Sequence, residues 1–96
     1  MVSMNEILAR RQEILSVAEK HGARNVRVFG SVVRGEATEE SDLDFLVEMN
    51  KQSSLLDRIA IINELQDLLH SKVDVVNEKA LHWTLRDRIL GEGVPL

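Results

Sequence analysis

The sequence has 96 residues, of which 44% are hydrophobic and 29% are charged, and it contains no cysteine. This composition is typical of one globular domain, so we expect residues 1–96 to form a single domain without disulfides or thiolate metal sites. The net charge of −4 argues against direct binding to nucleic acid, because a negative protein is repelled by the phosphate backbone. Apolar runs are much shorter than a membrane span and the start lacks a signal-peptide pattern, so we expect a cytoplasmic protein without a membrane partner.

The first half of the chain predicts a helix followed by a strand. Residues 4–21 carry apolar side chains at helical spacing, with Ser3 in a capping-box pattern at the start and Gly22 suited to the end. Residues 25–29 form a short apolar segment that predicts a strand ending in a tight turn.

The second half predicts a strand, a helix, a strand and a helix, at residues 43–47, 55–69, 72–77 and 81–89. Either Ser53 or Ser54 is expected to cap the long helix. Gly91 is expected to stop the last helix. Trp83 is predicted to fill the core, and the apolar tail 94–96 to pack on this domain or on another chain.

This order of elements predicts the α/β (α+β) class, with a small mixed three-stranded sheet and the helices packed on one face. Each helix has to bury an apolar stripe, and the sheet offers one apolar face. In the second strand, Asp42 and Asp44 point away from that face. Asp74 joins them if the third strand follows the same pleat. We therefore expect three carboxylates on the open face of the sheet.

Gly30 and Ser31 follow the first predicted strand directly. A glycine there lets backbone amides approach a ligand closely, and a short helix beginning at Ser31 would direct its free N–H groups at an anion. Arg34 would add a further donor. For the Gly-Ser pair alone, a simple turn stays open as an alternative.

Asp42 and Asp44 stand one strand repeat apart, which places their Cα atoms roughly 6.5 to 7 Å from each other. Two carboxylates at that separation can ligate one or two divalent ions. Mg²⁺ prefers a few carboxylates together with water and phosphate oxygens, so the pattern suits a magnesium site beside a phosphate-binding turn.

The spacing of these residues resembles the signature of the nucleotidyltransferase superfamily to which DNA polymerase β belongs. Gly30-Ser31, ten residues and then Asp42-x-Asp44 form the motif, and Asp74 matches the third acid on a later strand. The short chain and the Gly30-Ser31-x-x-Arg34-Gly35 form are similar to the minimal nucleotidyltransferases of bacteria and archaea. The likeness covers almost the whole chain and implies a polymerase β-like nucleotidyltransferase fold.

The resemblance implies a role for each of these residues. Asp42 and Asp44 would ligate two Mg²⁺ ions, and Asp74 would ligate the catalytic ion and accept a proton from the acceptor hydroxyl. Gly30 and Ser31 would bind the triphosphate of ATP. Arg34 would assist them, and a surface arginine paired with Glu36 is the open alternative.

The resemblance also implies a partner protein. In toxin–antitoxin members of the family, the small protein is an antitoxin that transfers AMP from ATP to a tyrosine of a HEPN-domain toxin. The sequence has no tyrosine, so such an acceptor lies on another protein. A homodimer of the chain alone stays open. Two other functions also stay open: a non-catalytic antitoxin that neutralises its partner by occlusion, and nucleotidyl transfer to a small molecule.

Overall fold

The computed structural model describes residues 2–96 and confirms the mixed α and β class. The helices and strands in chain order are α1 (Met4–Ala9), α2 (Arg11–Lys20), β1 (Ala23–Phe29), α3 (Ser31–Arg34), β2 (Leu43–Met49), α4 (Leu55–Leu69), β3 (Val73–Asn77), the 3-10 helix η1 (Glu78–Ala80), α5 (Trp83–Glu92) and β4 (Val94–Pro95).

The sheet has four strands in the order β3-β2-β1-β4, one more than the sequence predicts. β1 is antiparallel to β2 and β4, and β2 is parallel to β3. The additional strand β4 pairs Val94 with Val28 and Pro95 with Arg27. Leu96 follows it and is buried. The apolar tail therefore packs on this domain, as one of the two predicted possibilities.

The predicted first helix is two helices, with a break at Arg10 (φ −105°, ψ 17°). The hydroxyl of Ser3 accepts a hydrogen bond from the Glu6 N–H at 3.3 Å and caps α1 as expected. Gly22 follows α2 with φ +78°, which is the left-handed conformation expected at a helix end.

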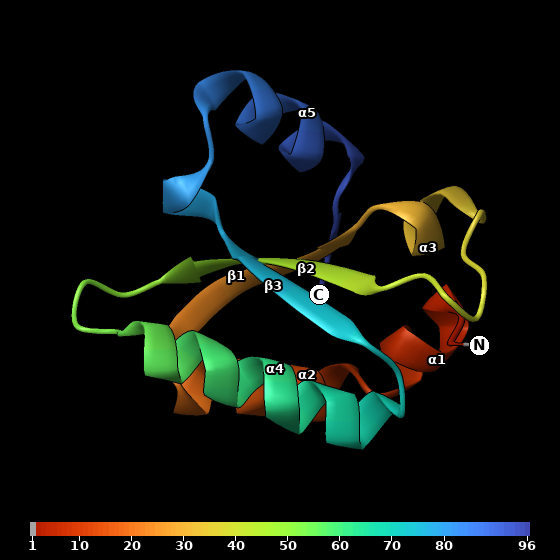
Figure 1. The fold of residues 1–96 in the computed structure, drawn as a ribbon, viewed down its shortest axis with the longest axis horizontal. Helices are drawn as coiled ribbons and strands as arrows, with labels where there is room; N and C mark the ends of the chain where they lie inside the picture. The colour runs from red at the N-terminus through yellow and green to blue at the C-terminus, as the bar shows by residue number, and fades with distance from the viewer. Residues whose placement is uncertain (1) are drawn as a thin grey trace.

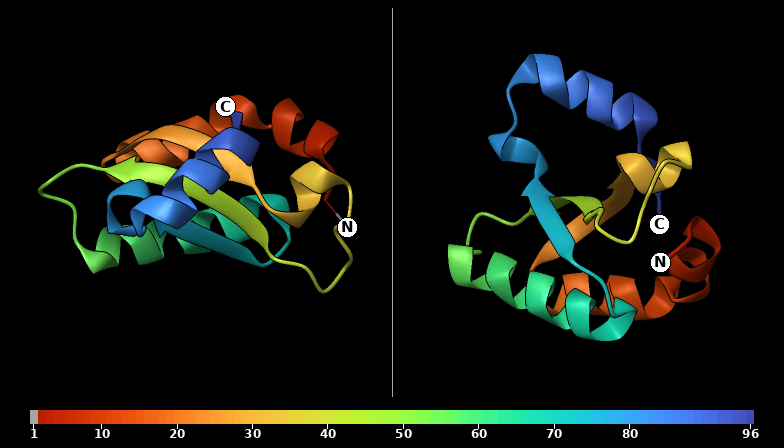
Figure 2. Two further views of the ribbon diagram at one scale, coloured as in Figure 1. Left: turned by 90° about the horizontal axis from the view of Figure 1, so that it is seen from above. Right: turned by 45° about the vertical axis from the view of Figure 1, so that its right-hand side comes forward.

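The helices lie on both sides of the sheet (Figures 1 and 2). α2 and α4 cover one face, and their side chains form the core with the apolar face of the sheet, around Phe45, Ile14 and Ile61. α5 lies on the opposite side, so the prediction that the helices pack on one face is wrong for α5. No residue of α5 is buried, so no apolar stripe draws this helix into the core.

Polar contacts tie α5 to the rest of the chain. Arg86 bonds Glu78 of η1 at 2.9 Å, and Glu92 bonds Arg34 at the end of α3 at 2.5 Å. The helix continues through Gly91 and ends at Gly93, two residues beyond the expected stop. Trp83 is 69% exposed, so the prediction that it fills the core is wrong.

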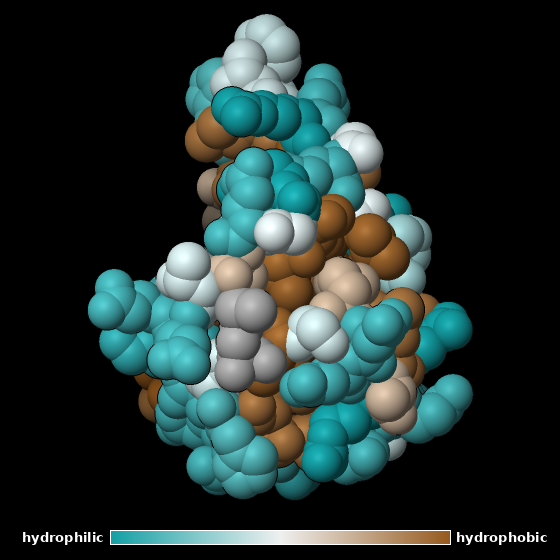
Figure 3. All heavy atoms as spheres, turned by 90° about the vertical axis from the view of Figure 1, so that its right-hand side faces the viewer, coloured by the Kyte–Doolittle hydropathy of each residue, from teal (hydrophilic) through white to brown (hydrophobic). Residues whose placement is uncertain are grey.

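Apolar side chains fix the position of α3. Val32 is buried and belongs to the main core. On the side of the molecule formed by α1 and α3, apolar side chains reach the surface (Figure 3), and Val2, Val32 and Val33 line a hollow there. This packing fixes the start of α3, and therefore Ser31, relative to the sheet. Among residues 2–96, no helix combines the length and apolar character needed to cross a bilayer.

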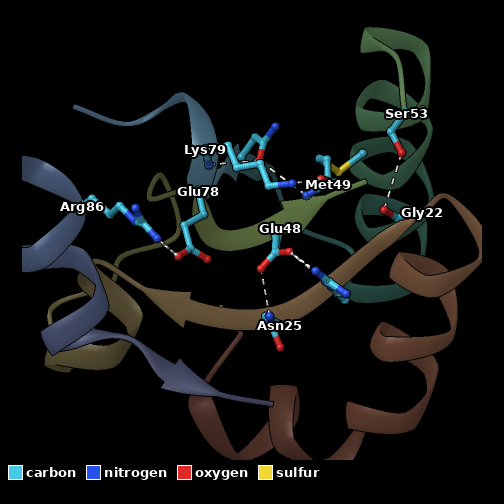
Figure 4. A network of polar contacts seen from close by, with 10 residues as sticks. Gly22, Asn25, Glu48, Met49, Ser53, Glu78, Lys79 and Arg86 are labelled. Carbon is cyan, nitrogen blue, oxygen red and sulfur yellow. Dashed lines mark hydrogen bonds and ion pairs between the residues drawn. The ribbon is translucent and has the colours of Figure 1, made fainter. Parts of the chain in front are cut away.

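The start of α4 is capped by Ser54. Its hydroxyl accepts a hydrogen bond from the Leu56 N–H at 3.2 Å, and its own N–H donates to the Asp57 carboxylate at 2.8 Å. Ser53, the other predicted cap, instead donates to the carbonyl of Gly22 (Figure 4). Ser54 therefore fixes the first turn of the helix that connects β2 to β3.

We expect Ser54→Ala to destabilise the protein by about 1 kcal/mol, because the variant leaves helix N–H groups without their cap. For a domain of this size, that loss lowers the melting temperature by roughly 4–8 °C. Thermal unfolding followed by circular dichroism measures it. Ser16→Ala, at an exposed position within α2, is the control and should change stability by less than about 0.5 kcal/mol. Equal effects in both variants would contradict the capping role.

Candidate functional site

Asp44 and Asp74 lie side by side on neighbouring strands. In the parallel pairing of β2 with β3, these two residues are direct partners in the register. Adjacent strands are about 4.8 Å apart, and partners in register point to the same face. Their neighbours Leu43 and Val73 are buried on the core side, whereas both carboxylates are partly exposed on the other face. Asp74 therefore faces away from the apolar interior.

Gly30 lies directly against the carboxylate of Asp44. It is buried, it has φ +83°, and a Cβ atom at this position would lie 2.4 Å from Asp44 Oδ2. A larger residue is therefore disfavoured by backbone conformation, and its Cβ would require the Asp44 carboxylate to move. Ser31 follows as the first residue of α3, so the predicted short helix begins where expected. Gly30 and Asp44 are thus in contact.

The charges around Asp44 are mostly negative. Burial raises its pKa above the ordinary value, the charges of Asp74 and then Asp42 raise it further, and Arg34 partly opposes them. Asp42 is exposed just before β2. Within residues 2–96, no three side chains of the His, Asp or Glu type converge closely enough to hold a metal ion. Asp42, Asp44 and Asp74 therefore share one electrostatic environment without forming a closed ligand set.

The residues at this position fit a divalent cation. Carboxylate oxygens are the ligands that Mg²⁺ and Mn²⁺ prefer. Burial and, after it, the negative charges of Asp74 and Asp42 raise the pKa of Asp44, and a positive ion between the carboxylates would relieve the charge repulsion. Asp42, Asp44 and Asp74 are the residues that could hold it.

Other acids on the polar side of the molecule are paired with arginines. Glu48, further along β2, accepts hydrogen bonds from Arg24 at 2.5 Å and from Asn25 at 3.1 Å (Figure 4). The hydrogen bond from Arg24 lowers the pKa of Glu48 most, and the one from Asn25 lowers it further. Glu78 is 8% exposed and bonds Arg86. The opposite pKa shifts of Glu48 and Asp44 distinguish a structural acid from the candidate site.

Arg34 is held by two carboxylates. Its Nη1 atom donates to Glu92 at 2.5 Å, and its Nε atom donates to Glu36 at 3.1 Å. The ion pair with Glu36 is therefore present, as the alternative for this residue required. A role of Arg34 in binding phosphate stays a prediction. Sequence reasoning missed Glu92, because its partner is 58 residues away and no local pattern connects them.

Sequence reasoning also missed Arg58, which reaches from α4 to the edge of the sheet. Its Nε atom donates to the carbonyl of Val75 at 2.6 Å, and its Nη2 atom lies 3.5 Å from Oδ1 of Asp74. In the sequence, Arg58 stands within a broadly apolar helix, and nothing near it indicates contact with a carboxylate. Predicting this contact would have required knowledge of where α4 lies relative to β3.

Comparison with known proteins identifies the family at this point. Residues 10–96 match the family described as nucleotidyltransferase domain. The chain belongs to the nucleotidyltransferase family. It is 40% identical over 93 residues to a candidate protein adenylyltransferase of Methanocaldococcus jannaschii, with 97% of each chain covered. It is 38% identical over 98 residues to the protein adenylyltransferase MntA of Thermococcus cleftensis, with 98% of this chain and 96% of the relative covered.

Solved structures agree with this family. A structure described as a candidate minimal nucleotidyltransferase matches this nucleotidyltransferase with a TM-score of 0.90 at 45% identity, covering 99% of this chain and 97% of the other. A complex of a tri-AMPylated Shewanella oneidensis HEPN toxin with an MNT antitoxin matches with a TM-score of 0.70 at 18% identity, covering 92% of this chain and 69% of the other. The second match shows the fold alone. The resemblance to minimal nucleotidyltransferases is confirmed.

We expect Gly30→Ala to destabilise this nucleotidyltransferase by about 2 kcal/mol more than Gly35→Ala. Both glycines have positive φ, but a Cβ at Gly35 would meet no atom within 4 Å, whereas one at Gly30 meets Asp44. The backbone differs as well: Gly30 (φ 83°, ψ −153°) lies in a region that is open essentially to glycine alone, whereas Gly35 (φ 75°, ψ 19°) is in the left-handed helical region, where alanine costs about 1 kcal/mol. Urea unfolding measures both variants. Equal losses would show that neither the backbone conformation nor the contact with Asp44 constrains position 30.

We expect Asp44→Asn to raise the melting temperature by a few degrees at pH 7. The raised pKa of Asp44 means that the folded protein holds this proton more tightly than the unfolded chain. The stability contributed by protonated Asp44 is fully present below the pKa of the unfolded chain and is lost as the pH rises through the pKa of the folded protein. Ionised Asp44 is therefore unfavourable at neutral pH. The gain from Asn should therefore shrink as the pH is lowered towards 3.8, the ordinary value for Asp.

Glu48→Gln provides the matched comparison for Asp44→Asn, because the pKa of Glu48 is lowered and its ionised form is stabilised. This variant should lower the melting temperature at pH 7, which is the opposite sign. Thermal unfolding across pH 3 to 8 measures both. A loss of stability in Asp44→Asn at pH 7 would contradict the electrostatic account of the site.

Proposed function

We propose that this nucleotidyltransferase transfers AMP from ATP to a hydroxyl group of a partner protein, using Mg²⁺ held by Asp42, Asp44 and Asp74. The observation that carries the proposal is the contact between Asp44 and Gly30, beside Asp74. This contact places carboxylates that suit a divalent cation next to a turn that suits phosphate. Two relatives at 38–40% identity over nearly the full length are named as a protein adenylyltransferase and a candidate protein adenylyltransferase, which supports the choice of reaction.

The chemistry is an in-line displacement at the α-phosphorus of ATP. The oxygen of the acceptor hydroxyl forms a bond to phosphorus, the bond to the β-phosphate oxygen breaks, and pyrophosphate leaves. Divalent cations, when bound, would stabilise charge on the attacking and leaving oxygens. Asp74 is the proposed acceptor of the hydroxyl proton.

The protein's own groups would bind and orient the substrate. The backbone of Gly30 and the hydroxyl and backbone of Ser31 are proposed to hold the triphosphate. Gly30 lacks a Cβ, so phosphate oxygens can approach the backbone beside Asp44 closely. Asp42 and Asp44 are proposed to hold a divalent cation, which would offset the negative charge of the phosphates. Arg34 is proposed to add positive charge at the end of α3.

The proposed acceptor is a tyrosine of a HEPN-domain toxin, so that the protein acts as an antitoxin and residues 1–96 form one minimal nucleotidyltransferase domain. The sequence contains no tyrosine of its own. The named relative MntA and the fold shared with the Shewanella oneidensis MNT antitoxin support a partner of this kind. ATP as the proposed donor is consistent with relatives that are named protein adenylyltransferases.

The test combines the purified protein with ATP labelled at the α-phosphate, Mg²⁺ and the purified product of the neighbouring gene. We expect label on the partner, and we expect Asp42→Asn/Asp44→Asn to lower transfer by at least about 100-fold, the scale on which charge-stabilising groups act. Glu48→Gln, which changes a paired acid on the same strand, is the control and should retain transfer.

The outcomes separate the proposal from its alternatives. A partner that stays unlabelled but is still inhibited by the double variant would favour neutralisation by occlusion. Label that reaches only a small molecule would favour the other alternative. Full transfer by the double variant would contradict the assignment of Asp42 and Asp44.

A further inference from the structure

Arg58 connects the helix layer to the edge of the sheet that carries Asp74. β3 is an outer strand and pairs only with β2. Arg58 comes from α4, and its Nε atom donates to the backbone carbonyl of Val75 at 2.6 Å. This short hydrogen bond to the backbone fixes the position of the guanidinium group at the edge of β3.

The contact between Arg58 and Asp74 is looser than the contact with the backbone. Nη2 of Arg58 lies 3.5 Å from Oδ1 of Asp74, and the side chains are 36% and 46% exposed. An ion pair with this exposure is weak and can be broken at low cost. The guanidinium is held by Val75 rather than by Asp74, so it stays beside Asp74 whichever way the carboxylate turns.

We infer that Arg58 competes with divalent cations for the carboxylate of Asp74, an inference that rests on the proposed function. Arg58 bonds Asp74, the carboxylate that would complete a ligand set with Asp42 and Asp44. Among residues 2–96, these three carboxylates do not converge closely enough to form that set. A positive charge beside Asp74 also lowers the attraction that an incoming cation experiences. Arg58 is thus a positioning residue that keeps Asp74 out of the ligand set until a competing cation binds.

This role predicts weak binding of metal to the protein alone. Nucleotide triphosphate supplies phosphate oxygens as additional ligands, and these compensate for the competition at Asp74. The site would then fill with metal and nucleotide together. Removing the positive charge should shift this balance towards metal binding without nucleotide.

The experiment titrates Mn²⁺ alone into metal-stripped protein and measures free Mn²⁺ by electron paramagnetic resonance. We expect Arg58→Met to bind Mn²⁺ about three- to tenfold more tightly than wild type, because one opposing unit charge is removed. Arg58→Lys keeps the charge and should lie closer to wild type. Arg11→Met changes an exposed arginine of α2, which covers the face of the sheet opposite to Asp44 and Asp74. This variant should match wild type.

The gain should depend on Asp74. In an Asp74→Asn background, the further change Arg58→Met should raise Mn²⁺ affinity by less than in the protein that keeps Asp74, because the direct competition has been removed with the carboxylate and only the longer-range repulsion remains. An unchanged or weaker affinity in Arg58→Met alone would overturn the inference. So would an equal gain in both backgrounds, since the effect would then not pass through Asp74.

Thermal unfolding in the presence of a chelator separates this role from a purely structural one. Arg58→Met loses the bond to Val75 and should melt at a lower temperature. A lower melting temperature without any change in Mn²⁺ affinity would show that Arg58 only supports the strand edge, and would overturn the inference. Wild type that binds Mn²⁺ but transfers no AMP would contradict the proposed function alone, whereas wild type that binds Mn²⁺ neither alone nor together with ATP would contradict both.

Discussion

The parallel register of β2 and β3 is the constraint on which the site depends. It places Asp44 opposite Asp74, and like charges in direct cross-strand positions are unfavourable. Burial is the main cause of the raised pKa of Asp44, and the negative charge of Asp74 raises it further. A parallel pair also requires a long crossover between its strands, and α4 is that crossover. The element that makes the two acids neighbours therefore also brings Arg58 to the strand edge.

The polar side of the molecule divides into a region of paired charges and a region of unbalanced charges. Glu48 and Glu78 each bond an arginine, so their charges are neutralised where they lie. Around Asp44 the neighbouring charges are mainly negative, and Gly30 leaves no room for a side chain between the turn and the carboxylate. Structural stability alone does not account for this arrangement, because replacing one acid by a neutral residue would relieve the repulsion. The cation binding that we propose would account for it.

Much of this arrangement follows from local sequence patterns. The period of two in β2 separates Asp44 from Phe45, and the same period in β3 separates Asp74 from Val75, so both acids could be placed on one face. β4 could not be predicted, since two residues, Val94–Pro95, are too few to show a period. The side of the sheet taken by α5 could not be predicted either. It depends on ion pairs between distant residues rather than on an apolar stripe, and contacts of that kind leave no trace in the local sequence.

The proposed phosphate site also has one part that local sequence predicts and one part that depends on contacts between distant residues. Gly30 and Ser31 offer backbone groups whose position is fixed by the strand before them and by the packing of Val32 beneath α3. Arg34 is already surrounded by the carboxylates of Glu36 and Glu92, so its charge is largely balanced before any phosphate arrives. A phosphate group would therefore gain less from Arg34 than from the turn. The position of the glycine turn is fixed without ligand, whereas Arg34 would have to exchange a bond to Glu36 or Glu92 for one to phosphate.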